Sequence, residues 1–290
     1  MNDDLGRSNS TDLMSFFNRT ITGIIFVAVV LFSLLIDTLQ TVFAVIVSVM
    51  ALIGTWEYYT IARRKGLFPL PLLGFLLGAA ILLDAWLYAF DHLIPILVIS
   101  VMLALIAHIL RLSYQGAVTD TAINMFGAWY VALPVALMLY MVRNVTDGKY
   151  FVAFLLGIVW MTDTGAYIVG KHFGIKKITP RLSPKKTVAG VMGGIITAVL
   201  VGILIWVFWE KFAELFSLKQ VITLSLLLSI IGQIGDLAES ALKRDAELKD
   251  SGITFTAHGG ILDIIDSLLF CAPVTYLYIL SVFPLYVPAM

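Results

Sequence analysis

The sequence predicts an all-α, polytopic integral membrane protein with about nine transmembrane helices and a cytoplasmic N-terminus. Three observations predict this class. Hydrophobic residues make up 60% of the 290 residues and charged residues only 13%, whereas about a quarter of the residues in soluble domains are charged. The apolar residues gather in runs of about 20, the length of helix that crosses a bilayer. These runs do not alternate as strands do, and the basic residues gather between every second pair of runs.

Nine apolar runs meet the length requirement, and the first follows a polar segment, residues 1–18, that lacks the basic start and cleavage site of a signal peptide. We therefore expect the first helix to stay in the mature protein. Asp84, Asp91 and His92 interrupt the third and fourth runs, which are the least regular. The predicted spans are residues 20–37, 39–61, 68–90, 92–112, 121–142, 150–170, 189–209, 220–242 and 260–283.

The distribution of Lys and Arg predicts the orientation of these spans. With the N-terminus in the cytoplasm, 15 of the 19 basic residues fall on the cytoplasmic side, as the positive-inside rule requires. The loop between the sixth and seventh spans is the most basic. We expect the protein in the inner (cytoplasmic) membrane of a bacterium, with the functional site facing the cytoplasm.

The chain divides by composition into a cytoplasmic N-terminal segment (1–18), a scaffold of transmembrane helices (19–115) and a catalytic transmembrane domain (116–290). The scaffold runs contain mainly aliphatic and aromatic residues. The net charge is zero, so nothing favours a nucleic-acid partner. No internal repeat is evident, which argues against many transporter folds.

Four acids lie at or within the later spans: Asp163, Asp236, Asp263 and Asp266. A carboxylate in the bilayer costs a few kcal/mol or more, so four of them indicate a function. Helical spacing places Asp263 and Asp266 on one face of the ninth span. On the eighth span, the same spacing aligns Asp236, Ser240 and Lys243 in one polar stripe. Three spans can therefore direct carboxylates into one cavity. Hard oxygen ligands suit Mg²⁺, which usually binds one or two protein carboxylates together with substrate phosphates.

Elements suited to phosphate binding surround these acids. Ser183-Pro184-Lys185-Lys186-Thr187 ends the basic loop, and adjacent lysines act as strong point charges. His258-Gly259-Gly260 opens the ninth span, where free N–H groups and the helix dipole favour an anion. The combination favours transfer between a nucleoside triphosphate and a lipid phosphate, a reaction that depends on positioning and charge neutralisation. Each element also has a structural interpretation, as an interhelical ion pair or a contact with anionic headgroups.

These motifs resemble those of the phosphatidate cytidylyltransferase (CDP-diacylglycerol synthase) family. The pattern Ser240-x-Leu242-Lys243-Arg244, then Lys249-Asp250, then His258-Gly259-Gly260-x-x-Asp263-x-x-Asp266 matches the spacing of that family's long motif. Asp163-Thr164-x-Ala166-Tyr167-x-x-Gly170-Lys171 and the Ser183–Thr187 segment with Gly190 resemble its two upstream motifs. The resemblance covers residues 120–285 strongly, and the first 110 residues share only hydrophobic character.

The resemblance implies that CTP and phosphatidic acid react to give CDP-diacylglycerol and pyrophosphate. The lipid phosphate would attack the α-phosphorus in line, without a strong base. Mg²⁺ would be held by Asp236 and Asp263, with K⁺ as a possible second cation, and family members form homodimers. The implied catalytic residues are Asp236, Asp263, Asp266, Asp250 and His258. The implied substrate-binding residues are Asp163, Ser183, Lys185, Lys186, Ser240, Lys243, Arg244, Lys249, Gly259 and Gly260.

The sequence departs from the family pattern at three places. Ile264 stands where the family usually has Arg, Thr256-Ala257 replaces Pro-Gly, and Ala189 replaces a Glu. Two other functions use similar residues. A CTP-dependent polyprenol or phytol kinase would transfer the γ-phosphoryl group instead, and an ion-coupled transporter would use intramembrane acids as an ion pathway. The spacing of the last motif favours the cytidylyltransferase.

Overall fold

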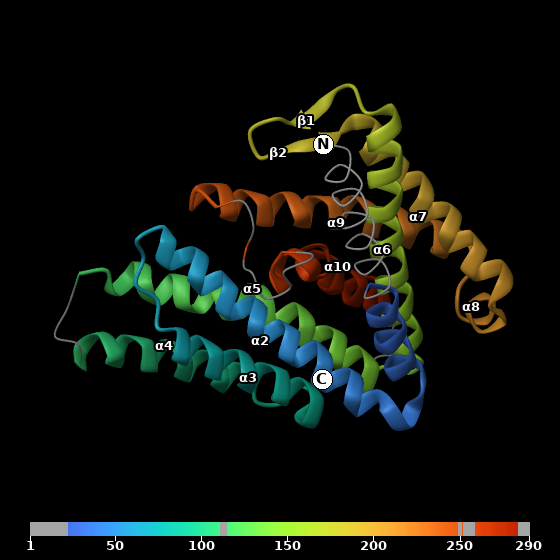
Figure 1. The fold of residues 1–290 in the computed structure, drawn as a ribbon. Helices are drawn as coiled ribbons and strands as arrows, with labels where there is room; N and C mark the ends of the chain where they lie inside the picture. The colour runs from blue at the N-terminus through green and yellow to red at the C-terminus, as the bar shows by residue number, and fades with distance from the viewer. Residues whose placement is uncertain (1–22, 111–114, 249–250, 252–258, 284–290) are drawn as a thin grey trace, which may run out of the picture.

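In the computed structural model, residues 23–110, 115–248, 251 and 259–283 are described (Figure 1). This part of the chain is almost entirely helical, and eight of its helices are long and apolar enough to cross a membrane. The all-α, polytopic class is therefore confirmed. The eight helices are α2 (Gln40–Arg64, preceded by the 3-10 turn Asp37–Leu39), α3 (Pro71–Tyr88), α4 (Leu93–Leu110), α5 (Ala117–Asn144), α6 (Gly148–Phe173), α7 (Val188–Phe208), α9 (Leu218–Asp245) and α10 (Ile261–Val282).

Each of the eight helices coincides with one predicted span to within a few residues. The remaining predicted span, 20–37, overlaps a shorter apolar helix, Gly23–Leu35, which begins where the described residues begin. Thus the count of nine, the cytoplasmic N-terminus and the domain boundary at residue 115 stay predictions. The short helix α8 (Glu210–Leu215) lies between α7 and α9.

Local sequence explains where several helices begin. The Thr187 hydroxyl accepts a hydrogen bond from Gly190 N–H at the start of α7, and Ser217 forms a reciprocal capping box with Gln220 at the start of α9. Such caps satisfy N–H groups that have no partner inside the helix. Pro71 occupies the first turn of α3, where a missing N–H has no cost.

The charged residues that interrupt the third and fourth spans form the turn between α3 and α4. Asp84 is 3% exposed, and its carboxylate accepts the backbone N–H of His92 at 3.3 Å and lies 3.0 Å from the ring Nδ1. Asp84 therefore provides a hydrogen-bond acceptor for a backbone N–H at the start of the following segment. This acid has a structural role outside the candidate site.

Two packed pairs of helices, α6 with α7 and α9 with α10, form the C-terminal part of the fold. Helix α6 packs closely along α7, because Gly165 and Gly194 leave no side chain between the two backbones. Helix α10 packs against α9, α5 and α2. Figure 1 shows α6 crossing α9 and α10 at a steep angle. A two-stranded antiparallel hairpin, β1 (Lys177–Thr179) and β2 (Ser183–Thr187), joins α6 to α7 and extends towards α9.

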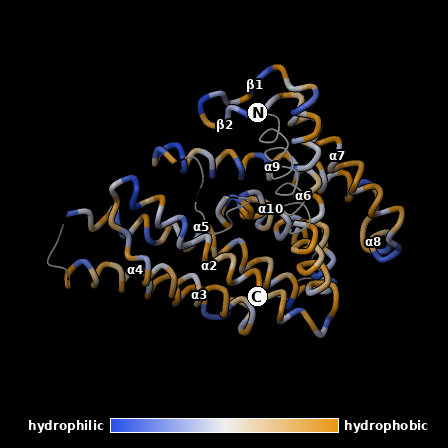
Figure 2. The backbone as a smooth tube through the Cα atoms, viewed as in Figure 1, coloured by the Kyte–Doolittle hydropathy of each residue, from blue (hydrophilic) through white to orange (hydrophobic). Residues whose placement is uncertain are grey.

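The outer faces of the helices are apolar, as a lipid environment requires. Figure 2 shows hydrophobic residues along most of the helices and hydrophilic ones at the hairpin and helix ends. Helix α4 is the clearest case, since Ile94, Val98 and Ile109 are more than half exposed. In lipid there is no hydrophobic driving force that would bury such apolar side chains inside the protein.

Candidate functional site

A pocket of about 700 Å³ lies between α6, the hairpin, the start of α7, α9 and α10. All four acids singled out from the sequence line it, so the predicted convergence of three spans is confirmed. The predicted residues that line this pocket are Asp163, Ser183, Lys185, Lys186, Asp236, Lys243, Asp263 and Asp266. The pocket is also lined by Lys171 and Lys177, which sequence reasoning did not assign to the site.

The hairpin is held over α9 by two basic side chains. Lys186 Nζ on β2 lies 2.6 Å from Asp236 Oδ2 on α9, and both side chains are only partly exposed, at 20% and 36%. Arg244 Nε, near the end of α9, donates to the carbonyl of Leu182 in the hairpin turn at 3.1 Å. Both contacts join the hairpin to α9 with a charged donor, although water competes with the partly exposed Lys186–Asp236 pair. The basic hairpin therefore forms one wall of the pocket.

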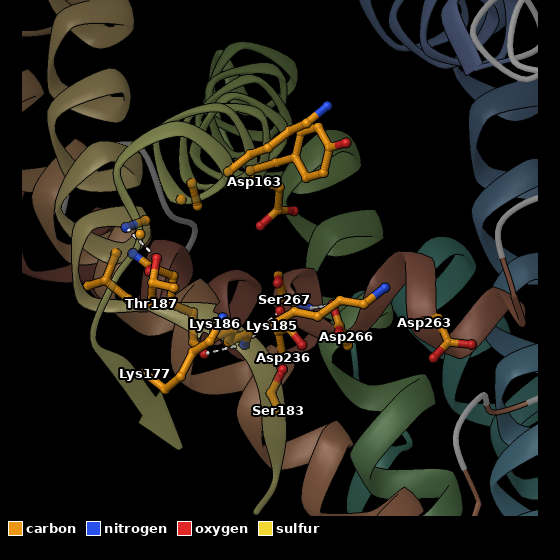
Figure 3. Close-up of a pocket in the computed structure, with 18 of the residues that line it drawn as sticks. Asp163, Lys177, Ser183, Lys185, Lys186, Thr187, Asp236, Asp263, Asp266 and Ser267 are labelled. Atoms are coloured by element: carbon orange, nitrogen blue, oxygen red, sulfur yellow. Dashed lines mark hydrogen bonds and ion pairs between the residues drawn. The ribbon is translucent and has the colours of Figure 1, made fainter. Parts of the chain in front are cut away.

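Asp163 and Asp266 line the same pocket but differ from Asp236 and Asp263 in their partners. Among the described residues, neither carboxylate forms an ion pair, and Asp266 accepts a hydrogen bond only from the backbone N–H of Ser267. Asp266 is 7% exposed. In the close-up of Figure 3, Asp266 lies between Asp236 and Asp263, and Asp163 projects from α6 on another side of the pocket. The Asp266 carboxylate is buried, and buried negative charge without a cation is costly, so this region is suited to bind one.

A second, more buried ion-pair network lies at the α10 end of the pocket. The Lys243 ammonium contacts the carboxylates of Glu239 and Asp263, and the Glu239 side chain is fully buried. Asp263 Oδ2 also accepts the N–H of Gly260 at 2.7 Å and the Ser251 hydroxyl at 2.8 Å. Every part of the Asp263 carboxylate is thus held by a neighbour.

The backbone N–H groups at the start of α10 donate hydrogen bonds to carboxylates of the protein itself. Gly260 N–H donates to Asp263, and Leu262 N–H donates to Glu57 Oε2 at 2.8 Å. The glycines make this possible. Gly259 has φ +90°, and a Cβ there would lie 2.7 Å from Asp263 Oδ2. Sequence reasoning expected these glycines to allow approach of a substrate phosphate, and in this structure they allow approach of carboxylates.

Glu57 is the residue of this region that sequence reasoning missed. It belongs to α2, in the half interpreted as scaffold, and is 4% exposed. A signal was present, because Glu57 is the one acid within the apolar run 39–61. A buried acid in a span indicates a function or a specific partner.

Several predicted residues lie away from the pocket lining. Ser240 is buried on α9, and Arg244 bonds the hairpin and the Leu248 carbonyl. Gly259 and Gly260 contact Asp263 and do not line the pocket. Lys249, Asp250 and His258 fall outside the described residues.

The three departures from the family pattern fall in different surroundings. Ile264 lines a narrow apolar crevice with Phe26 and Trp160, on the side of α10 away from the pocket. An arginine there would face apolar side chains. Ala189 lies in the first turn of α7, and Thr256-Ala257 lies outside the described residues.

The carboxylates of the pocket do not form a closed metal site in the described part of the chain. Within the described ranges, no group of three or more His, Cys, Asp or Glu side chains is arranged as a closed metal site. Asp236 and Asp263 both line the pocket and are each paired with a lysine. Asp236, the more exposed of the two, fits an ion such as Mg²⁺ that completes its coordination with water and substrate phosphates, whereas a metal at Asp263 would have to share its carboxylate with Lys243.

The fold and the pocket together define a class: a polytopic membrane protein with a pocket lined by carboxylates and lysines. Comparison with known proteins gives the family. Residues 17–282 match the Cytidylyltransferase family. The chain is 34% identical over 274 residues to a phosphatidate cytidylyltransferase of Bacillus subtilis (strain 168), covering 91% of this chain and 97% of that protein. It is 30% identical over 271 residues to a phosphatidate cytidylyltransferase of Chlamydia pneumoniae, with 88% of each chain covered. The chain therefore belongs to the cytidylyltransferase family and is an enzyme of the membrane.

Proposed function

We propose that the protein makes CDP-diacylglycerol and pyrophosphate from CTP and phosphatidic acid. The observation that carries this proposal is the convergence of four carboxylates and several lysines in one pocket of a membrane-spanning chain. Relatives named phosphatidate cytidylyltransferase align with nearly the whole chain, which favours the same donor and acceptor. A pocket of about 700 Å³ suits a nucleotide, since ligand sites commonly have volumes of about 300–1,000 Å³.

The lysines of the hairpin would bind the triphosphate. Lys185 and Lys186 line the pocket from β2, and Lys177 lines it from β1. In-line attack by a phosphatidic acid oxygen forms a new P–O bond at the α-phosphorus and breaks the bond to the β-phosphate bridge. Pyrophosphate leaves with its electron pair, and the lysines stabilise its charge. No strong base is needed, because the attacking phosphate is already largely ionised.

Asp236 and Asp263 are proposed to hold Mg²⁺, with K⁺ as a possible second cation. A bound metal ion would supply charge neutralisation at the phosphate oxygens. Asp236 contributes from α9 and Asp263 from α10, and Lys186, the partner of Asp236, would turn towards an incoming phosphate. Asp266 and Asp163 add negative charge that favours cations in the pocket.

The remaining functional context is also a proposal. The basic hairpin and the basic ends of α2 and α9 lie on one side of the spans, which favours a pocket open to the cytoplasm of a bacterial inner membrane. A homodimer is proposed from the family resemblance. Lys249, Asp250 and His258 are proposed to complete the polar lining of the site.

The test uses purified protein, phosphatidic acid, Mg²⁺ and CTP labelled at either the α- or the γ-phosphate. Label is counted in the organic phase and in pyrophosphate. The expected result is α-label in the lipid and γ-label in pyrophosphate. If γ-label enters a polyprenol or phytol acceptor and no α-label enters phosphatidic acid, the protein is a lipid kinase and the proposal is wrong. If no label is transferred to any of these acceptors, the proposal is equally wrong and ion-coupled transport is tested next.

A further inference from the structure

Glu57 is a buried acid that connects the scaffold half of the chain to the candidate site. It lies near the end of α2, about 200 residues before the acids of α10 in sequence, and its side chain is 4% exposed. Lipid-facing or packing roles suit apolar residues, and burial of a carboxylate is costly unless specific groups bind it. The groups that bind Glu57 therefore indicate what it does.

The carboxylate of Glu57 binds the first turn of α10. Its Oε2 accepts the backbone N–H of Leu262 at 2.8 Å, and the Ser251 hydroxyl lies 3.3 Å from the same oxygen. The first N–H groups of a helix have no partner within the helix, and negative charge is favourable there. Glu57 thus fixes the start of α10 from another helix.

The contact is close enough to require glycine at residue 260. A Cβ on Gly260 would lie 2.5 Å from Glu57 Oε2 and 2.2 Å from Ser251 Oγ, both far inside normal contact distance. Any larger residue would have to displace Glu57 or Ser251. The Glu57 contact therefore accounts for the glycine at this position.

The same first turn carries Asp263. The Ser251 hydroxyl is 2.8 Å from Asp263 Oδ2, and the N–H of Gly260 is 2.7 Å from the same oxygen. Since a hydroxyl has one proton, Ser251 donates to Asp263, the nearer carboxylate. Glu57 and Asp263 thus divide the N–H groups of the turn, one holding Leu262 and the other holding Gly260.

We propose that Glu57 is a positioning residue, which fixes the first turn of α10 so that Asp263 faces the pocket. This inference rests on the proposed function of Asp263 as a metal-binding residue. Among the described residues that line the pocket, Glu57 is absent, so its effect on Asp263 would be indirect. Its contribution is transmitted by the Leu262 N–H, in the way that partners of a ligand orient it in other metal sites.

The experiment compares Glu57→Ala, Glu57→Gln and Gly260→Ala with a matched control, Asp84→Ala. Asp84 is also a buried acid of the scaffold half that accepts a backbone N–H, but it lies at the α3–α4 turn. Each full-length variant is purified in detergent, and Mn²⁺ binding with CTP present is measured by electron paramagnetic resonance. Thermal stability and α-label transfer are measured on the same preparations.

Glu57→Ala is expected to weaken Mn²⁺ binding about 10- to 100-fold, the range found when the partner of a metal ligand is removed. Glu57→Gln keeps an acceptor for Leu262 N–H and is expected to stay within about 3-fold of the wild type. Gly260→Ala should resemble Glu57→Ala. Asp84→Ala should lose thermal stability and keep Mn²⁺ affinity.

The proposal is overturned if Glu57→Ala binds Mn²⁺ as the wild type does, or if its loss is no greater than that of Asp84→Ala. It is also overturned if Glu57→Gln is impaired as much as Glu57→Ala, because the acceptor would then not be what matters. These outcomes are independent of the proposed reaction. If wild-type protein transfers no α-label, the cytidylyltransferase proposal fails while the Mn²⁺ comparison still decides the role of Glu57.

Discussion

Two lysine–aspartate pairs face the same pocket and differ in how many neighbours hold them. Lys186 and Asp236 form a single pair between the hairpin and α9, and the aspartate side chain is 36% exposed. Lys243 and Asp263 belong to a network with Glu239 and Ser251, in which no side chain of the ion pairs exceeds 15% exposure. One lysine–aspartate pair is therefore partly open to solvent, and the other is enclosed by protein.

The difference teaches which pair can exchange partners. Water competes for an exposed pair, so its net contribution to stability is small, about 0–1 kcal/mol. Phosphate and metal can therefore separate Lys186 from Asp236 at low cost. Breaking a buried pair leaves an uncompensated charge and costs more. We infer that the Lys243 network fixes the geometry of the site and that the Lys186 pair opens to admit the ligands.

The largest effect should come from removing either proposed metal-binding carboxylate. Asp236→Ala and Asp263→Ala are each expected to lower α-label transfer at least about 10³-fold, because charge neutralisation of the phosphates is lost. The two should differ in stability. Only Asp263→Ala removes the partner of Gly260 N–H, so it alone should lower the melting temperature measured in detergent. Equal melting temperatures would contradict the distinction between the open and the enclosed pair.

Replacing each lysine in turn should show the difference between the open and the enclosed pair most clearly in the free energy of unfolding. Lys243→Met leaves the Glu239 and Asp263 carboxylates without their cation and is expected to destabilise the protein by about 3–5 kcal/mol. Lys186→Met is expected to cost less than about 1 kcal/mol. Unfolding followed by tryptophan fluorescence in detergent gives both values. A larger loss in Lys186→Met than in Lys243→Met would reverse the assignment.

A smaller effect is expected at the hydroxyl that the network uses. Ser251→Ala removes the donor to Asp263 at 2.8 Å and should destabilise the protein by about 1 kcal/mol. The KM for Mg²⁺ should rise while the KM for phosphatidic acid stays constant, because the hydroxyl contacts the carboxylate and not the lipid. Steady-state kinetics at varied Mg²⁺ measures this, and a change confined to the lipid KM would argue against it.

The smallest effect is expected at an exposed pair outside the pocket. Lys65 Nζ lies 2.6 Å from Asp245 Oδ1, and the side chains are 45% and 68% exposed. Lys65→Ala should change stability by less than about 0.5 kcal/mol and leave transfer activity unchanged. This variant is the control for the general effect of removing a lysine–aspartate pair. A loss comparable to that of Lys243→Met would show that exposure does not decide the cost.

The membrane class, eight of the spans and the set of acids follow from the sequence. Hydropathy is enough for the spans because every backbone polar group in lipid must be satisfied inside its own helix, so long apolar runs become helices regardless of their neighbours. Helical spacing was enough to place Asp263 with Asp266, and Asp236 with Lys243, on pocket-facing sides.

Local sequence did not predict the use of the N–H groups at the start of α10. The glycines there suggested an open anion site, and that expectation is general for a helix N-terminus. In the structure, Glu57 from α2 and Asp263 occupy those groups. A partner that approaches from another helix leaves no trace in the spacing of residues 258–266.

The sequence by itself therefore determined what must be buried in lipid and which charged residues require an explanation. The tertiary structure decided which charge meets which. It pairs Lys186 of the hairpin with Asp236, encloses Lys243 between Glu239 and Asp263, and brings Glu57 to the first turn of α10. The physical reason is that hydropathy and helical period act within one segment, whereas an ion pair or a cap depends on distances between segments that only packing fixes.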